Sequence, residues 1–237
     1  KRVSPEKFLL GEVWEDATTK FGFNKRRTYL LGKGLDSVMN YPFKDAVLDF
    51  VKGKPAQQAA GEILSICEHY PAPALNTALN FLSTHDTERA LTVIADEPAN
   101  GRGREWQSGR NVSGEAYEEG MLRLRMAYAI IYTLPGLPCL YYGDEIGMQG
   151  YRDPFNRGYY CWDSHEERLK PVLAQLAQLR HSCEAFRTGA LRVLRAEGGV
   201  LHYQRVGATE TAEIIVNRSE HIIVEPLASG KHTEVNP

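Results

Sequence analysis

Two carboxylates and an imidazole stand at places in the sequence where side chains commonly do chemistry. Glu12 follows one short apolar run and His85-Asp86 follows another, so each group comes where a strand is predicted to end. A carboxyl group can give a proton to a reacting oxygen, and an imidazole beside a carboxylate can bind hydroxyl groups as donor and acceptor. Trp14 adds a flat aromatic face, on which a sugar ring can stack, close to Glu12. These residue types predict proton transfer beside a hydroxyl-rich ligand.

Each group also has a purely structural interpretation. Glu12 and the acidic residues that follow Trp14 are typical of a solvated turn that opens a helix. Asp86 or Thr87 could cap a helix that begins near Glu88, because their side-chain oxygens accept hydrogen bonds from free N–H groups of a first turn. Taken alone, neither group decides between the structural and the chemical interpretation.

The elements that must position these residues are short β-like runs separated by helical patterns. The runs cover residues 8–13, 35–40, 78–83 and 137–142, and the helical patterns cover 55–70, 115–134 and 166–186. Such alternation is the sequence form of parallel βα units. In a barrel of these units, the carboxyl ends of the strands surround one mouth, where the loops carry the catalytic groups. We therefore expect Glu12, His85 and Asp86 to share one mouth of an α/β barrel.

The pattern changes after Arg187. Short β-like runs joined by turn residues follow at 191–194, 200–206, 213–217 and 222–224. They predict a small antiparallel β domain, so that residues 1–187 and 188–237 form two domains. Earlier in the chain, residues 96–114 make a long loop rich in glycine and arginine, which is either a mobile surface segment or a lid over a site.

Composition argues against several classes of function. The 237 residues carry 28 basic and 30 acidic side chains, a net charge of −2, so we expect no nucleic-acid partner. The longest apolar stretch, 126–142, is interrupted by proline and glycine and is shorter than the roughly 20 residues of a membrane helix. Four cysteines without CxxC spacing and seven histidines without HExxH spacing predict free thiols, no protein-held metal and a cytoplasmic location.

Five segments carry a resemblance to a known family. In chain order they are residues 11–14 (GEVW), 39–43 (MNYPF), 81–89 (FLSTHDTER), 135–148 (PGLPCLYYGDEIGM) and 153–163 (DPFNRGYYCWD). Together they resemble the α-amylase family, glycoside hydrolase family 13. The first two are most similar to the segments of neopullulanase-like and cyclomaltodextrinase-like enzymes. An ordered set that spans nearly the whole chain is far more specific than any one of its members.

The resemblance implies a (β/α)8 TIM barrel followed by a β domain, with this chain supplying barrel strands five to eight in residues 1–187. It implies cleavage of α-glucosidic bonds with retention, in maltooligosaccharides, cyclodextrins or related α-glucans. Glu12 matches the family's general acid/base, which protonates the leaving oxygen and later activates water. Asp86 matches the second carboxylate, which binds sugar hydroxyls and stabilises the transition state. His85 would bind the same sugar, and Trp14 would contact the substrate.

One departure from the family bears on activity. The family's nucleophilic Asp lies on barrel strand four, two residues after an Arg, and no such pair precedes Glu12. A retaining mechanism needs two carboxyl groups roughly 5–5.5 Å apart, one of them the nucleophile. We therefore expect this chain to be a fragment that is inactive alone. The resemblance implies no cofactor here, although some relatives bind calcium through regions outside this chain.

Half a barrel would leave strand edges without partners. We therefore expect the chain to form a homodimer or to associate with the complementary half-barrel, and to bind an α-glucan. Two alternatives stay open. One is a non-catalytic half-barrel that binds sugar or a partner protein. The other is an α-glucan transglycosylase, which shares the motifs and differs in how water is kept from the covalent intermediate.

Overall fold

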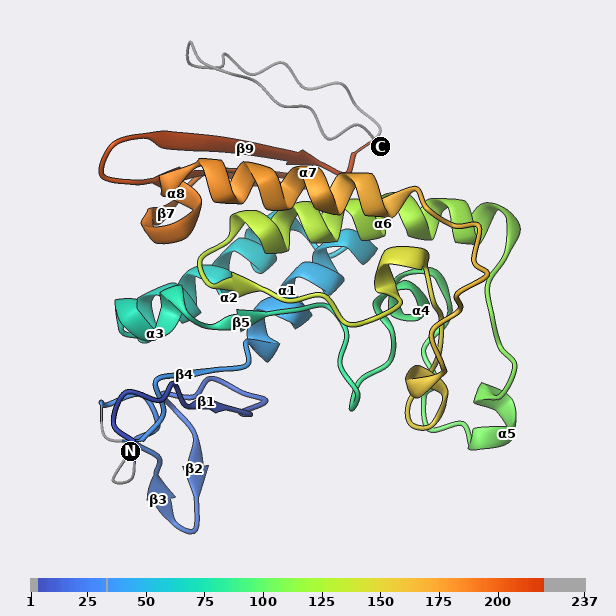
Figure 1. The fold of residues 1–237 in the computed structure, drawn as a ribbon, viewed down its shortest axis with the longest axis horizontal. Coiled ribbons are helices and arrows are strands. Elements are labelled where there is room, and N and C mark those ends of the chain that lie inside the picture. The colour runs from blue at the N-terminus through green and yellow to red at the C-terminus, as the bar shows by residue number, and fades with distance from the viewer. Residues whose placement is uncertain (1–3, 33, 220–237) are drawn as a thin grey trace.

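The computed structural model describes residues 4–32 and 34–219. Helices form most of its body, with the short strands near the N-terminus beneath them and the last strand above them (Figure 1). The helices and 3-10 turns are α1 (Tyr41–Lys52), α2 (Ala56–His69), α3 (Ala72–Asn76), α4 (Ala90–Ala95), α5 (Arg104–Gln107), α6 (Gly114–Thr133), η1 (Asp144–Ile146), η2 (Phe155–Arg157), α7 (Leu169–Ser182) and α8 (Glu184–Thr188). The strands are β1 (Leu10–Gly11), β2 (Phe21–Gly22), β3 (Lys25–Arg26), β4 (Ser37–Val38), β5 (Leu79–Asn80), β6 (Leu137–Pro138), β7 (Ala190–Glu197), β8 (Val200–Val206) and β9 (Thr211–Asn217).

The four predicted βα strands pair in parallel and in chain order. β1 pairs with β4, a single parallel bridge joins Met39 to Leu79, and β5 pairs with β6. The paired lengths are shorter than the apolar runs, because flanking backbone groups bond elsewhere. The N–H of Leu9, for example, donates to the Asp36 carboxylate at 2.7 Å. Parallel pairing in this order places the carboxyl ends of the four strands on one side.

The helix α1 was not predicted from the sequence, although its start is marked. Asn40 is the N-cap, and its side chain accepts a hydrogen bond from the Phe43 N–H at 3.3 Å. Phe43, Val47 and Phe50 are all buried in the core. The neighbouring helix α2 follows the prediction closely, beginning after Pro55 and carrying its buried stripe on alanine and isoleucine residues. The two helices pack against each other above the strands.

The predicted helix over 166–186 is two helices. Cys183 has an extended backbone (φ −107°, ψ 116°), and its N–H bonds to the Leu179 carbonyl at 3.0 Å, which ends α7. The helix α8 starts at the next residue. An apolar stripe alone does not reveal this break, because the residues on both sides of Cys183 continue the same pattern.

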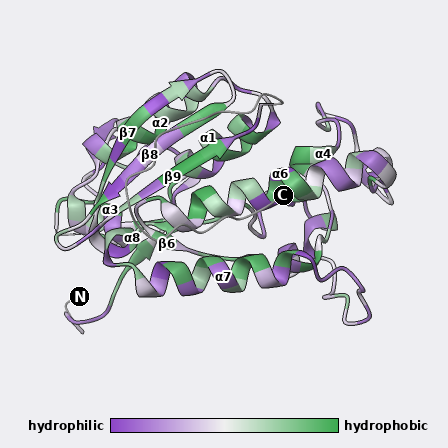
Figure 2. Ribbon diagram, turned by 90° about the horizontal axis from the view of Figure 1, so that it is seen from above, coloured by the Kyte–Doolittle hydropathy of each residue, from purple (hydrophilic) through white to green (hydrophobic). Residues whose placement is uncertain are grey.

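The antiparallel sheet β7-β8-β9 follows α8 and covers α2 (Figure 2). Leu201, Tyr203 and Val216 of this sheet belong to the same apolar core as the helices. Arg205 is fully buried and donates to the carbonyls of Thr133 at 2.6 Å and Gly189 at 2.7 Å. The strand predicted at 222–224 lies outside the described residues.

The strands β2 and β3 form a hairpin after β1. This hairpin extends away from the helical body (Figure 1). All four cysteines are free, as expected. Within the described parts of the chain, no helix is both long and apolar enough to cross a membrane.

Candidate active site

Glu12, His85 and Asp86 come together in space although they follow different strands. Glu12 comes directly after β1, and the other two follow β5, with β4 between the two strands. One ligand atom of each residue lies within 4.8 Å of the other two, and all three side chains are exposed. His85 Nε2 is 3.2 Å from Asp86 Oδ2. The structure thus brings the three residues expected at one mouth into a single cluster.

Tyr41 orients Glu12. It is the first residue of α1, and its hydroxyl donates to Glu12 Oε1 at 2.7 Å. Tyr41 is buried, and burial together with the hydrogen bond to Glu12 raises the pKa of Tyr41, so that its hydroxyl remains a donor at neutral pH. Tyr41 was not predicted as a site residue. Its signal was its place just after the apolar run 35–40, in the segment shared with the α-amylase family.

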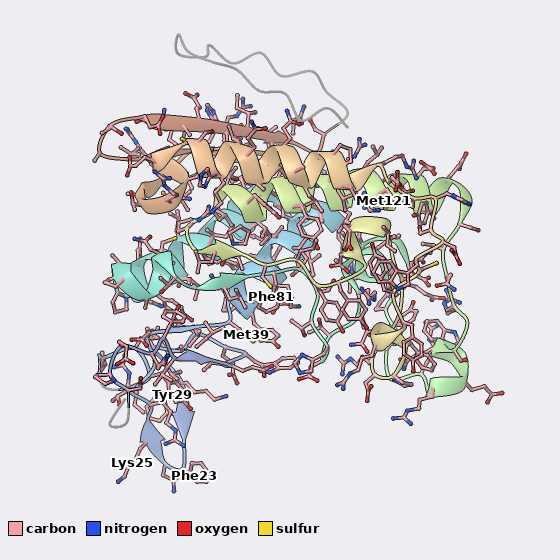
Figure 3. The ribbon with its side chains drawn as sticks, in the orientation of Figure 1. Phe23, Lys25, Tyr29, Met39, Phe81 and Met121 are labelled. Carbon is pink, nitrogen blue, oxygen red and sulfur yellow. The ribbon has the colours of Figure 1, made fainter. Side chains whose placement is uncertain are left out.

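The indole ring of Trp14 lies flat on Tyr41. The two ring centroids are 4.4 Å apart with planes 14° from parallel, and Phe81 meets Tyr41 edge-on at 4.9 Å. Phe81 lies below the long helices (Figure 3). Trp14 is nevertheless 49% exposed. Part of this ring is therefore accessible beside Glu12, as stacking on a sugar would require.

A second segment, far along the chain, holds the turn that carries His85 and Asp86. Asn156 in η2 is fully buried, and its Nδ2 donates to three backbone carbonyls, including those of His85 at 2.8 Å and Thr87 at 2.7 Å. Arg157 Nε donates to the His85 carbonyl at 2.9 Å, and Arg157 Nη2 donates to Asp86 Oδ1 at 3.0 Å. The turn is thereby fixed by donors that the sequence analysis placed in a shared segment but did not assign to the site.

The helix-capping interpretation of Asp86 and Thr87 is wrong. The helix α4 begins at Ala90, whose N–H donates to Ser83 Oγ at 2.8 Å. The Thr87 hydroxyl instead accepts a hydrogen bond from the Thr84 N–H at 2.9 Å within the turn. The Asp86 carboxylate therefore caps no helix and lies in the cluster with Glu12 and His85.

The acidic turn after Trp14 exists, but it does not open a helix. Asp16 accepts a hydrogen bond from the Thr18 N–H at 2.8 Å, and the chain continues into the hairpin β2-β3. Glu12 takes no part in this turn, because its carboxylate binds Tyr41.

A buried ion pair lies close to the turn that carries His85 and Asp86. Arg89 and Asp144 are almost fully buried, and Arg89 Nη1 lies 3.2 Å from Asp144 Oδ1. Arg89 Nη1 also donates to the Tyr142 carbonyl at 2.6 Å, and the Tyr128 hydroxyl donates to Asp144 Oδ2 at 2.7 Å. Burial raises the pKa of Asp144 to about 6, although the hydrogen bonds from Ser83 and Tyr128 and the charge of Arg89 oppose the rise.

Side-chain contacts hold the long loop 96–114 in place. The guanidinium groups of Arg102 and Arg110 both lie over the Trp106 ring, at 4.1 and 4.3 Å from its centroid. Arg110 also makes two hydrogen bonds to Asp96, at 2.7 and 3.1 Å. Gln149 bonds twice to the backbone of Val112. These contacts brace the loop, and they test neither interpretation drawn from the sequence, a mobile surface segment or a lid over a site.

The cluster suits proton transfer and hydroxyl binding. Arg157 lies against Oδ1 of Asp86, and His85 lies against Oδ2. These contacts fix the orientation of the carboxylate, which favours a role in binding a ligand. Glu12 is held through one oxygen only in the hydrogen bonds described. The three residues could also bind a divalent cation, but the guanidinium group beside Asp86 opposes a second positive charge. We assign no metal to the cluster.

Comparison with known proteins identifies the family. The family described as the catalytic domain of alpha amylase matches residues 1–188. The chain belongs to the alpha-amylase family. The resemblance read from the ordered segments is thereby confirmed, and the family is one of glycoside hydrolases.

Within the alpha-amylase family, similar proteins share nearly all of this chain. A cyclomaltodextrinase of Geobacillus thermopakistaniensis is 32% identical over 98% of the chain and 35% of its own length. Neopullulanase 2 of Thermoactinomyces vulgaris is 30% identical over 98% of the chain and 36% of its own length. The solved cyclic alpha-maltosyl-(1→6)-maltose hydrolase of Arthrobacter globiformis matches with a TM-score of 0.74 and 27% identity, over 93% of this chain and 43% of its own. This chain thus spans about a third of the two curated relatives.

Proposed function

We propose that the chain supplies the general acid/base and two substrate-binding groups of a retaining hydrolase of α-glucosidic bonds. The observation that carries this proposal is the convergence of Glu12, His85 and Asp86 within 4.8 Å, with Trp14 alongside, in a chain of the alpha-amylase family. Relatives named for cyclomaltodextrin and pullulan suggest α-glucans of that kind as substrates.

The proposed mechanism assigns each group a step. Glu12 gives its proton to the glycosidic oxygen as the bond to the anomeric carbon breaks, and a carboxylate nucleophile takes the sugar as a covalent ester. Glu12, now ionised, removes a proton from water, which attacks the anomeric carbon and releases the nucleophile. The hydrogen bond from Tyr41 fixes one oxygen of Glu12, so that the other can face the substrate. His85 and Asp86 bind sugar hydroxyls.

The nucleophile is proposed to come from a segment outside this chain. Asp86 is the nearest carboxylate to Glu12 in the cluster, but Arg157 and His85 lie against its two oxygens and lower its nucleophilicity. The chain alone is therefore expected to be inactive. The complementary segment would be the first half of a barrel, which would pair with the sides of β1 and β6 that have no partner strand among the described residues. Leu10 and Leu137 in these strands are 39% and 44% exposed.

The test is release of reducing sugar from maltooligosaccharides and cyclodextrin. The chain is compared with a longer chain that adds the preceding barrel strands, with and without Glu12→Gln. Activity of the longer chain only, lost in the Glu12→Gln variant, is the expected result. Activity of this chain alone would show that another carboxylate within it supplies the nucleophile, and an active Glu12→Gln variant would remove Glu12 from the mechanism. Products longer than the substrate would favour the transglycosylase over the hydrolase.

A further inference from the structure

An exposed turn of the loop 96–114 holds an asparagine that is followed by a glycine. Both residues have positive φ values, 48° at Asn100 and 79° at Gly101, and the Arg102 N–H donates to the Ala99 carbonyl at 2.9 Å. These values and this bond match a type I′ turn, in which asparagine and glycine are favoured central residues. The turn comes shortly before α5, and both of its central residues are exposed to water (Figure 1).

The side-chain amide of Asn100 and the backbone nitrogen of Gly101 can react with each other. In the part of the chain that the structure describes, no hydrogen bond engages the Asn100 side chain or the Gly101 N–H. Gly101 also has no atom within 4 Å of the place where a side chain would stand. The nitrogen can therefore approach the amide without a side chain in the way, and the conformational freedom of glycine lets the backbone turn toward it.

The other asparagines lack at least one of these features. No other asparagine in the sequence is followed by glycine. Asn40, Asn80 and Asn156 are also fully buried. Asn24 is the best match, because it is exposed and has a φ of 59°, but Lys25 follows it at the tip of the β2-β3 hairpin (Figure 3). The two turns thus differ in the residue that supplies the attacking nitrogen.

We propose that Asn100 is a site of spontaneous covalent modification, which converts it to aspartate and isoaspartate. The Gly101 nitrogen gives its proton to hydroxide and forms a bond with Cγ of Asn100. The Cγ–Nδ2 bond breaks, and Nδ2 leaves as ammonia with a proton from water. Water then opens the resulting succinimide ring at one of its two carbonyls. Opening at Cγ gives aspartate, and opening at the main-chain carbonyl gives isoaspartate. This reactivity belongs to the thermal lability of asparagine.

Isoaspartate places an additional carbon atom in the main chain, and this loosens the loop 96–114. The turn sets the position of Arg102, whose Nη2 donates to Glu97 at 2.9 Å. The guanidinium group of Arg102 lies 4.1 Å from the centroid of the Trp106 ring, and its carbonyl accepts a hydrogen bond from Gln107 Nε2 at 2.8 Å. A longer turn displaces the residue that makes all of these contacts. The loop then becomes more accessible to proteases.

The experiment follows the purified chain by peptide mass spectrometry during storage at alkaline and at slightly acidic pH. A methyltransferase that acts on isoaspartyl carboxylates detects the second product. We expect a gain in mass at Asn100 before any at Asn24, and a faster gain at alkaline pH, because hydroxide removes the Gly101 proton. Asn100→Gln should lose the gain, because its longer side chain must close a larger ring. Lys25→Gly should create a second reactive site at Asn24.

Each outcome bears on one part of the proposal. If Asn100 stays unmodified during alkaline storage, or is converted no faster than Asn24, the site is wrong. If Lys25→Gly leaves Asn24 unreactive, the following residue is not what selects the site. The effect on the loop is measured by tryptic cleavage after Arg102. Faster cleavage of the stored chain than of the fresh chain, absent in stored Asn100→Gln, is the expected result. Equal cleavage of stored and fresh chains, with Asn100 converted, would overturn the loosening.

Discussion

The two sides of the candidate site are held in very different ways. The turn with His85 and Asp86 lies between Ser83 and Arg89, which both contact the buried Asp144, and a buried asparagine binds three backbone carbonyls of the turn. Glu12 follows a two-residue strand that pairs, among the described residues, only with β4, and Tyr41 supplies the hydrogen bond that orients it. The side proposed to bind the substrate is therefore built within this chain, whereas the side proposed to carry the acid/base depends on what pairs with the edge of β1 that has no partner among the described residues.

The largest effect is expected from Arg89→Met. Removing the guanidinium leaves the buried Asp144 without its ion-pair partner, which costs about 3–5 kcal/mol of the free energy of unfolding. Denaturant unfolding measures this loss. The matched control is Arg152→Met, because Arg152 is 76% exposed and lies 3.7 Å from Glu88, and an exposed pair of this kind contributes about 1 kcal/mol or less. Equal losses in the two variants would refute the supporting role of the buried pair.

The pH dependence of stability should show the titration of Asp144. Its pKa is raised to about 6 in the folded chain, against 3.8 as its ordinary value. Between these values the folded state holds a proton that the unfolded state has lost, so this group makes the free energy of unfolding fall as pH rises, by up to about 1.4 kcal/mol per pH unit. Other acids contribute their own slopes. The measurement is therefore the difference between the unaltered chain and Asp144→Asn from pH 4 to 6. An unchanged slope in the variant would contradict the assignment.

Asn156→Ala should loosen the turn that carries His85 and Asp86. Three carbonyls lose a donor, with a cost of about 1–3 kcal/mol in the free energy of unfolding. In the longer chain, KM for maltoheptaose should rise more than kcat falls, because the groups proposed to bind the sugar move. Asn156→Asp keeps the size of the side chain but removes its donors, so it should behave like the alanine variant. An unchanged KM for maltoheptaose in Asn156→Asp would show that the size of this side chain, and not its hydrogen bonds, holds the turn.

The smallest effect on stability is expected from Tyr41→Phe. The ring keeps its packing against Trp14, and only the hydrogen bond to Glu12 is lost, which costs about 0.5–1.5 kcal/mol. In the longer chain, kcat should fall about tenfold, because Glu12 loses the donor that orients one of its oxygens. Tyr117→Phe removes a comparable bond to Glu166 far along the chain, and should leave kcat unchanged. Equal kcat values for the two variants would exclude an orienting role for Tyr41.

Much of the frame could be predicted from sequence, since it depends on local patterns. The tips of the parallel strands and the helices α2 and α6 follow from apolar runs, periodicity and prolines that lie close together in the chain. Predicting the cluster needed one more step, the rule that parallel strands share their carboxyl ends. The resemblance to the alpha-amylase family then predicted a chemical role for each of the two acids, Glu12 and Asp86.

The supports of the site could not be predicted in the same way. Asn156 binds carbonyls about 70 residues earlier in the chain, and no local pattern distinguishes it from an asparagine in a surface turn. Arg89 sits in a recognised segment, but its burial depends on Asp144 in another. The helix α1 is a different case, because the sequence does mark its start. Asn40 is the N-cap and Pro42 lies in the first turn, but the apolar residues that follow were not predicted to be helical.

The junction at Thr133 decides how the last sheet behaves. The Thr133 hydroxyl lies 2.5 Å from the Tyr203 hydroxyl, and its carbonyl accepts a hydrogen bond from Arg205. A cut near residue 188, which the change in sequence pattern suggests, would strip both partners from the end of α6 and uncover the core beneath β8. The amide hydrogens of β8 should therefore exchange with deuterium as slowly as those of α6. The sheet and the helices would then open as one cooperative unit.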